Sequence, residues 1–459
     1  MKRLIFICIV YIFSAFLSDL KADDFFRIWL KDKKNSPYTL ERPQDFLTQA
    51  SLNRRLKQGY ELDDDDLPLS PVYISRLNDL GLVVSQSKWM NTVVIKVTPQ
   101  IKKEMLSGLS FVDSVRWLGK YNMPSFTEYK TAICRTQKYK TTPAAVANIS
   151  SESREQLTLL NGEKLHKAGF KGEGIQIAII DAGFPSWDSL PLIDAGRVKE
   201  YMDFSYPKDS GYGKEKHGTQ VLSILLADSD DSIKGTAPEA TYHLYKTENM
   251  AYELPVEEDF WVEALERADR MGVHIVNSSL GYHSFDIPAL NHSKREISRS
   301  TAFISRAARK AINKGMFLVI SAGNDAMTDW GIIGFPADEK DVLTVGSVDR
   351  NGNVSSFSSS GFVSGGYVKP DVAAIGTGTV MLLPDGSCST SNGTSFSTPT
   401  VAGLVACLWQ ACPGLSNREL LDVIRRSGSQ YKRPDIYTGY GIPDFMKALL
   451  LAGELKKDN

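Results

Sequence analysis

Short apolar runs alternate with helical patterns from about residue 156 to residue 452. Helical patterns occupy residues 256–270 and 301–314, between runs of three or four mostly apolar residues. Strands that are apolar on both faces and alternate with helices are typical of a parallel sheet with helices on both faces. The sequence therefore predicts an α/β domain whose functional side chains gather at the carboxyl ends of its strands. The predicted strands are residues 177–180, 274–276, 317–320 and 342–345.

The first 22 residues have the layout of a secretory signal peptide. Lys2 and Arg3 precede an apolar run over residues 4–17, and residues 18–22 are mostly polar and small. The run is short for a permanent membrane helix, although an N-terminal membrane anchor is the alternative interpretation. We expect cleavage after Ala22, no membrane contact after that cleavage, and a secreted or periplasmic protein.

Residues 23–118 predict a small separate α+β domain. An acidic run within it, residues 63–66, is interpreted as a solvated loop rather than a cation site. The polar segment 119–155 has no periodicity and predicts an exposed, cleavable linker, and residues 453–459 form a polar tail. In the small domain we expect strands at residues 25–30, 89–97 and 112–118 and helices at residues 43–56, 73–80 and 99–109.

Charge and cysteine content exclude two classes of protein. The 53 basic and 54 acidic residues leave a net charge of −1, so no basic excess indicates a nucleic-acid partner. Five cysteines are too few for a disulfide scaffold in a chain of 459 residues. Cys388 with Cys412 is the disulfide pairing that we consider, and Cys407 is expected to be buried.

Four polar residues stand at predicted strand ends or helix starts. Asp181 and Asn324 follow strands, whereas His217 and Ser395 each precede an apolar helical pattern. Taken singly, each fits an ordinary structural role, such as a turn-forming Asp or an N-cap Ser. Together, Asp181, His217 and Ser395 follow one of the known chain orders of a catalytic triad. The carboxamide of Asn324 can donate to a developing oxyanion.

These motifs resemble those of the subtilisin-like serine proteases, the peptidase S8 family. The resemblance covers residues 156–451 and implies a subtilisin-like parallel sheet. Residues 23–118 resemble the ferredoxin-like propeptide of secreted Bacteroidetes-type members. The family commonly has Ser or Thr where this chain has Ala182. The matching stretches are Ile-Ile-Asp-Ala-Gly (179–183), His-Gly-Thr (217–219), Ser-Ala-Gly-Asn (321–324) and Gly-Thr-Ser-Phe-Ser-Thr-Pro (393–399).

The resemblance implies a secreted serine endopeptidase that is made as a self-processing zymogen. Ser395 would attack the scissile carbonyl to form an acyl-enzyme, His217 would move the proton, and Asp181 would orient the imidazole. Asn324 would belong to the oxyanion hole. An extended substrate would lie as an added strand beside the substrate-binding residues, a mode that predicts broad specificity. These residues are Ser279, Leu280, Gly281, Ser321, Ala322 and Gly323.

The implied partners are protein or peptide substrates and the chain's own propeptide, which would act as an intramolecular inhibitor. No cofactor is implied apart from structural calcium, and no metal site is named because the acidic candidates lack an informative spacing. These candidates are Asp228, Asp230, Asp231, Asp325 and Asp329.

Three other interpretations remain open at this point. A catalytically silent relative, retained as a secreted binding protein, is favoured only by Ala182. A nucleotide-binding α/β protein would need a Gly-x-Gly-x-x-Gly or a Gly-Lys-Ser/Thr phosphate loop, which the sequence lacks. An esterase of the α/β-hydrolase type would need Gly-x-Ser-x-Gly and the triad order Ser, Asp, His.

Overall fold

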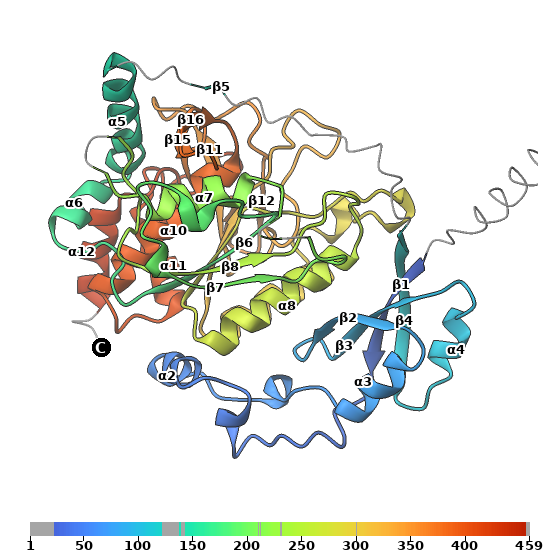
Figure 1. Ribbon diagram of the computed structural model, residues 1–459. Helices are drawn as coiled ribbons and strands as arrows, with labels where there is room; N and C mark the ends of the chain where they lie inside the picture. Colours follow the sequence, from blue (N-terminus) through green and yellow to red (C-terminus); the bar gives the residue numbers. More distant parts are fainter. Residues whose placement is uncertain are drawn as a thin grey trace, which may run out of the picture.

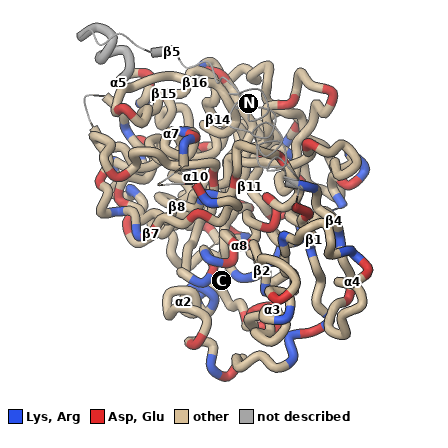
Figure 2. The backbone as a smooth tube through the Cα atoms, turned by 45° about the vertical axis from the view of Figure 1, so that its right-hand side comes forward, with Lys and Arg blue, Asp and Glu red and all other residues tan. Residues whose placement is uncertain are grey.

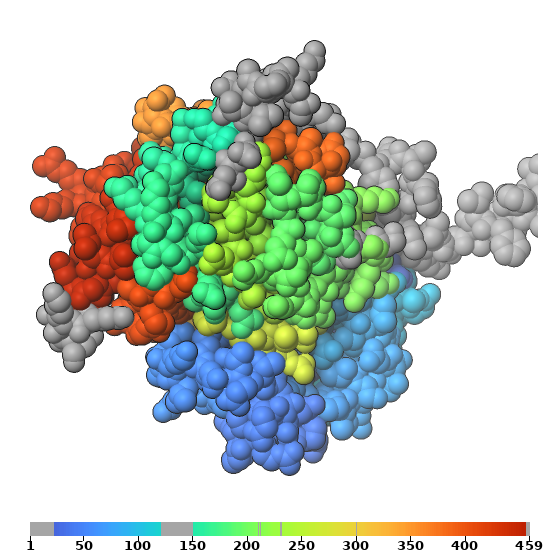
Figure 3. Space-filling view, turned by 60° about the vertical axis from the view of Figure 1, so that its left-hand side comes forward, coloured from blue at the N-terminus to red at the C-terminus, as the bar shows by residue number. Residues whose placement is uncertain are grey.

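The computed structural model describes residues 23–121, 137–138, 143–209, 211, 213–229, 232–299 and 301–455. The predicted signal peptide, residues 122–136 of the predicted linker and most of the predicted tail therefore lie outside the described residues. A small N-terminal domain, blue in Figure 1, packs beneath a larger domain that runs from green to red. The space-filling view shows the two domains in close contact (Figure 3).

The larger domain is built on a seven-stranded sheet in which every neighbouring pair is parallel. The strand order is β14-β11-β10-β9-β6-β8-β7. All side chains of β9, β10 and β11 are buried, which confirms the predicted doubly covered parallel sheet. The strands are β6 (Gln176–Asp181), β7 (Val198–Asp203), β8 (Thr241–Lys246), β9 (Ile275–Ser278), β10 (Phe317–Ser321), β11 (Leu343–Val348) and β14 (Val372–Ile375).

Two hydrophobic clusters fill the two faces of this sheet. Because strand side chains alternate, Ile177 and Ile179 join one cluster whereas Ala178 and Ile180 join the other. Helices α6, α7, α10, α11 and α12 contribute to the first cluster, and α8 and α9 contribute to the second. The helices of this domain are α6 (Gly162–Lys167), α7 (His217–Leu226), α8 (Val256–Met271), α9 (Phe303–Asn313), α10 (Thr394–Ala411), α11 (Asn417–Ser427) and α12 (Phe445–Leu455).

Part of the segment expected as a linker has regular structure. Helix α5 (Pro143–Thr158) occupies its end, and β5 (Gln137–Lys138) pairs with β16 (Cys388–Ser391). Strand β16 also pairs with β15 (Thr379–Leu382), and β12 (Phe362–Ser364) pairs with β13 (Tyr367–Lys369). Cys388 is a free, half-buried thiol, so the pairing with Cys412 is wrong, whereas Cys407 is buried as expected. No helix in the described part of the chain is long and apolar enough to cross a membrane.

The N-terminal domain is a four-stranded antiparallel sheet with helices. Its strand order β2-β3-β1-β4, with helices between β1 and β2 and between β3 and β4, is ferredoxin-like. Strand β2 was not predicted, and the strand expected from residue 89 begins at Thr92, after a turn in which Asn91 has φ 51°. The elements are β1 (Asp23–Leu30), α2 (Gln49–Gln58), α3 (Pro71–Asn78), β2 (Leu82–Ser87), β3 (Thr92–Val97), α4 (Lys103–Ser107) and β4 (Val112–Tyr121).

The first predicted helix of this domain begins later than expected. The residues from Pro43 form only a three-residue 3₁₀ turn, η1 (Pro43–Asp45). Helix α2 then starts after Thr48, whose side chain accepts a hydrogen bond from the N–H of Ser51. An N-cap of this kind satisfies one of the donors that a helix start leaves unpaired, so Thr48 fixes the boundary.

Candidate active site

The sheet brings the ends of three neighbouring strands to one edge. Ile180 on β6, Ser278 on β9 and Ile320 on β10 lie at the same level in the parallel register. Asp181 ends β6, residues 279–281 follow β9, and residues 321–324 end and follow β10. The parallel register therefore gathers three predicted motifs that are far apart in the sequence.

Asp181 and His217 form a hydrogen-bonded pair at this edge. Oδ1 of Asp181 lies 2.7 Å from Nδ1 of His217, and the same oxygen accepts from the N–H of Ala182 at 2.7 Å. The carboxyl side chain is fully buried, and its Oδ2 has no hydrogen-bond partner among the described residues. Ala182 provides no hydroxyl to this second oxygen. The first oxygen nevertheless holds Nδ1 of the imidazole in a hydrogen bond.

His217 reaches Asp181 because helix α7 begins unusually close to the loop after β6. A Cβ atom on Gly218 would lie 2.5 Å from the carbonyl oxygen of Gly183 and 2.7 Å from the ring of Phe184. Only glycine fits this approach. Thr219 then fixes the first turn, since its hydroxyl donates to the carbonyl of Pro185 at 2.8 Å. Local contacts therefore explain why each of the three positions of the His-Gly-Thr motif carries its residue.

The charges around His217 act on its pKa in opposite directions. Burial lowers the pKa of His217, but Asp181, which is hydrogen-bonded to the ring, and Glu215 together raise it by more. The net effect is a pKa above the ordinary value of an imidazole. A histidine in this state gains a proton readily when a neighbouring hydroxyl loses one.

Ser395 lies in the first turn of the buried helix α10. The start of this helix lies beside the pair, because the ring of the next residue, Phe396, has its centroid 5.5 Å from that of His217. In this structure the Ser395 hydroxyl donates to the carbonyl of Ser279 at 3.3 Å, and no hydrogen bond to His217 is found within the described residues. Its backbone N–H lies in the first helical turn, where N–H groups have no partner within the helix.

The side-chain oxygen of Asn324 faces the start of helix α10. The Oδ1 atom accepts from the N–H of Thr394 at 2.9 Å and from its hydroxyl at 3.1 Å. A backbone N–H can only donate, so this contact fixes the orientation of the carboxamide and turns its NH₂ group the other way. The NH₂ group is therefore free to donate into the cavity beside Ser395.

A cavity of 270 Å³ joins most of the predicted site residues. Asp181 and His217 are not among its lining residues. Leu280 does not line it either and packs instead against the hydrophobic cluster around α8 and α9. Thr394, His283 and Gly334 were not predicted from the sequence, and Asp325 was predicted only as a calcium candidate, although Thr394 and Asp325 adjoin predicted residues. The lining consists of Ser279, Gly281, His283, Ser321, Ala322, Gly323, Asn324, Asp325, Gly334, Thr394 and Ser395.

Comparisons with known proteins agree with this geometry. Residues 172–441 match the model of the subtilase family, peptidase S8. The chain belongs to the subtilase family. Residues 26–133 match the peptidase S8 propeptide domain of Bacteroidota, so the N-terminal domain is a propeptide domain and the larger domain is a subtilase domain.

Several relatives are similar over the subtilase domain. Subtilisin DY of Bacillus licheniformis is 30% identical over 262 residues, which are 57% of this chain and 85% of that protein. Subtilisin Savinase of Lederbergia lenta is 26% identical over 59% of this chain and 90% of that protein. The match to M-protease of Shouchella clausii (strain KSM-K16), also 26% identical, spans 63% of that protein's length. The crystal structure of MycP1 from Mycobacterium smegmatis shares the fold, with a TM-score of 0.52 at 23% identity over 68% of this chain and 89% of that chain.

The propeptide domain is held by one face of helix α8. Four carboxylates at helical spacing lie on this face, and each contacts the propeptide domain. Arg27 of β1 binds the first of them, Asp259, through Nε at 2.8 Å and Nη2 at 2.6 Å, and both side chains are almost fully buried. Figure 2 shows acidic and basic segments meeting where α8 lies against the propeptide strands. The carboxylates are those of Asp259, Glu263, Glu266 and Asp269.

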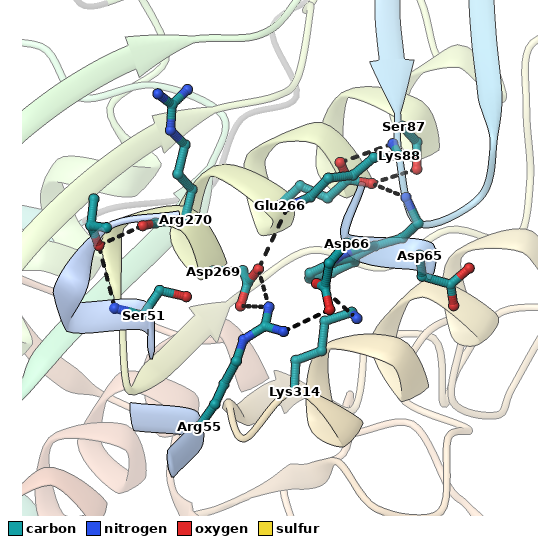
Figure 4. Close-up of polar contacts among 12 residues, drawn as sticks. Ser51, Arg55, Asp65, Asp66, Ser87, Lys88, Glu266, Asp269, Arg270 and Lys314 are labelled. Carbon is teal, nitrogen blue, oxygen red and sulfur yellow. Dashed lines mark hydrogen bonds and ion pairs between the residues drawn. The ribbon is translucent and has the colours of Figure 1, made fainter. Parts of the chain in front are cut away.

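The far end of α8 makes equally specific contacts (Figure 4). Glu266 accepts from the Ser87 hydroxyl at 2.5 Å and from the N–H of Trp89 at 3.0 Å, and so binds the turn between β2 and β3. Nη2 of Arg55, on α2, donates to Oδ2 of Asp269 at 2.7 Å and to its Oδ1 at 2.8 Å. Burial raises the pKa of Asp269, but Arg55 and Arg54 lower it by more, so it lies below its ordinary value. Asp269 therefore remains an anion in the interface.

The acidic run 63–66 reaches into this interface, although Asp63 and Asp64 are exposed as in a solvated loop. Asp66 is fully buried, and its carboxylate pairs with Arg55 at 2.8 Å and with Lys314 at 2.9 Å. Asp63 also pairs with Lys314, at 3.1 Å, and Asp65 pairs with Lys310. The two lysines belong to the subtilase domain. The interpretation as a solvated loop fails for Asp66, because its partner Lys314 comes from a distant segment (Figure 4).

Three other acidic side chains form a cluster, and one of them, Glu248, is close enough to Asp181 to interact with its charge. Oxygens of Glu248, Glu253 and Glu257 lie within 4.8 Å of one another. Burial, together with repulsion from Glu248, raises the pKa of Glu253 to about 8, and burial raises the pKa values of Glu248 and Glu257 as well. Such a group holds protons at neutral pH.

The acidic residues considered for calcium have other partners. Asp228 pairs with Lys234 at 2.6 Å and Asp325 lies 3.3 Å from His283. Asp230 and Asp231 lie outside the described residues. Asp228 and Asp325 therefore each face a basic side chain in the described part of the chain.

Proposed function

We propose that this chain is the precursor of a secreted serine endopeptidase that hydrolyses peptide bonds with the triad Asp181, His217 and Ser395. The observation that carries the proposal is the 2.7 Å contact between Asp181 and His217, beside the start of the helix that carries Ser395. A buried carboxylate on Nδ1 leaves the opposite ring nitrogen to act as the base.

The reaction follows from the positions of these groups. The Ser395 hydroxyl leaves its weak contact with the Ser279 carbonyl, gives its proton to Nε2 of His217 and attacks the scissile carbonyl. The Asp181 carboxylate stabilises the imidazolium that forms. His217 then returns the proton to the leaving amine, the C–N bond breaks, and water releases the acyl group from Ser395 by the same route.

Two donors support the tetrahedral intermediate. The NH₂ group of Asn324 and the N–H of Ser395 both adjoin the carbonyl under attack, and the start of α10 adds a favourable potential for a negative oxygen. The substrate backbone would lie along residues 279–281 and 321–323, which continue β9 and β10. Leu280 would contribute only its backbone, since its side chain packs inward.

The propeptide domain would keep the precursor inactive. Strand β4 ends against the loop before α8, where a Cβ on Gly119 would lie 2.8 Å from the side chain of Leu254. The following segment would enter the substrate groove and be cut by the domain's own site within residues 119–155. The buried ion pairs on α8 would then hold the cut propeptide domain as an inhibitor until it dissociates. Secretion would follow removal of residues 1–22.

Covalent labelling tests the proposed nucleophile. A fluorophosphonate should label the processed protein at Ser395, and Ser395→Ala should abolish the label. Ser397→Ala is the matched control, because Ser397 lies in the same helix and its hydroxyl donates to the carbonyl of Thr394 at 2.9 Å. This control should keep the label. A processed wild-type chain without label, or a label that persists in Ser395→Ala, would contradict the proposal.

A further inference from the structure

The cavity beside Ser395 contains a carboxylate that the proposed mechanism does not use. Asp325 follows the predicted oxyanion donor Asn324, and its side chain lies over Gly323, where a Cβ atom would be 3.0 Å from Oδ2. The side chain is 21% exposed. It is the one acidic side chain among the described residues that line this cavity.

The present partners of Asp325 leave much of its hydrogen-bonding capacity unused. Nε2 of His283 lies 3.3 Å from Oδ1, and the Ser359 hydroxyl lies 3.4 Å from Oδ2. Charge-assisted hydrogen bonds are normally about 2.7–2.9 Å long, and a carboxylate offers about four acceptor positions. A cationic group entering the cavity would therefore find acceptor positions that neither partner fills well.

His283 is held so that it forms part of the wall. Its ring stacks on Trp330 with a centroid distance of 4.6 Å and an interplanar angle of 7°, and its Nδ1 lies 2.7 Å from the Ser284 hydroxyl. The remaining lining is made of small residues, among them Gly281 and Gly334. A long side chain can therefore extend through the 270 Å³ cavity until it reaches Asp325.

The position of the cavity identifies which substrate residue it receives. Ser395 and Asn324 both line it, and both contact the carbonyl under attack in the proposed reaction. The side chain one bond from that carbonyl belongs to the residue before the cut, called P1. This cavity adjoins both groups and is therefore placed to receive that side chain.

We propose that Asp325 makes the enzyme selective for substrates with Lys or Arg at P1. This inference rests on the proposed function and adds the substrate class to it. A carboxylate in a partly dehydrated cavity recognises an ammonium or a guanidinium, whereas a neutral side chain of the same length would leave the carboxylate desolvated without a new partner.

Peptide pairs that differ only in charge at P1 test the proposal. The processed enzyme is given one peptide with Arg or citrulline at P1, and another with Lys or norleucine. We expect kcat/KM to be about 10- to 100-fold higher for the charged member of each pair, as is typical of hydrogen bonds to a charged group. Asp325→Asn should remove most of this preference and leave hydrolysis of the citrulline peptide little changed, whereas Asp325→Glu should keep the preference.

Asp329→Asn is the matched control, because Asp329 is an exposed acid four residues further along the chain that does not line the cavity. It should retain the wild-type ratio. Equal kcat/KM for Arg and citrulline in the wild type would overturn the inference, and so would an unchanged ratio in Asp325→Asn. Hydrolysis without preference, with Ser395 still labelled, refutes this inference alone. Failure to hydrolyse any peptide, together with absent labelling, refutes the proposed function on which it rests.

Discussion

Replacing Arg27 with Met should release the propeptide domain far more readily after processing. Arg27 donates three hydrogen bonds to the Asp259 carboxylate and a fourth to the carbonyl of Pro255, and its guanidinium lies 3.5 Å from the centroid of the Phe303 ring. Methionine keeps much of the apolar volume but removes the charge. Asp259, only 1% exposed, would be left in the interface without its cation.

The expected magnitude follows from this burial. Breaking a buried ion pair by removing one partner costs about 3–5 kcal/mol, because the remaining charge stays desolvated. Each 1.36 kcal/mol is a factor of ten, so the propeptide should dissociate at concentrations roughly 150- to 5,000-fold higher than from the wild type. Arg42→Met is the matched control: Arg42 is 70% exposed and pairs with Asp45, so its removal should change dissociation by less than about fivefold.

Dilution of the self-processed enzyme measures this effect. Peptidase activity is recorded at once after dilution to a series of concentrations, and the midpoint gives the dissociation constant of the propeptide. Burial raises the pKa of Asp259 to about 6 although Arg27 opposes the rise. Protonation therefore favours the bound state, and this contribution is lost as the pH rises through about 6. The defect of Arg27→Met should thus be smaller after equilibration at pH 5 than at pH 8. Equal midpoints for Arg27→Met and Arg42→Met would refute the reasoning.

Two further changes test the proposed catalytic groups. Asp181→Asn should lower kcat by about 10⁴-fold, the loss known for a triad carboxylate. It should also shift the acid limb of the kcat/KM profile to lower pH, because Asp181 raises the pKa of His217. An unshifted limb would show that the ionising group behind it is not His217. Asn324→Ala should lower kcat by about 10²–10³-fold with little change in KM, the magnitude measured for such a donor in a subtilisin; a loss confined to KM would place Asn324 in substrate binding instead.

The candidate site residues stand out in the sequence because they adjoin apolar runs. Asp181 and Asn324 come directly after strands whose hydrophobic boundaries are sharp, and Ser395 precedes a long apolar helix. Parallel pairing then aligns the strand ends without further information. Strands β7 and β8 carry charged or polar residues along their length, so their pattern does not stand out from that of a loop or a helix.

Contacts between distant segments could not be predicted from the sequence. Asp66 lies in an acidic run, and only Arg55 and Lys314, brought to it by the fold, turn that run into a buried interface. His283 and Asp325 come from loops after different strands, and neither has a local pattern that marks it as a wall of the cavity. Helix α5 has too little apolar periodicity to be recognised by that signal.

The central claim is that the chain cuts itself with Ser395. The most direct test follows the intact mass of the purified precursor with time, for the wild type and for Ser395→Ala at low concentration. The account predicts that the wild type yields a fragment ending within residues 119–155 at a rate independent of concentration, while Ser395→Ala stays whole. Cleavage of both chains at the same position and rate would contradict it, as would a wild type that remains uncut under conditions where Ser395 reacts with a fluorophosphonate.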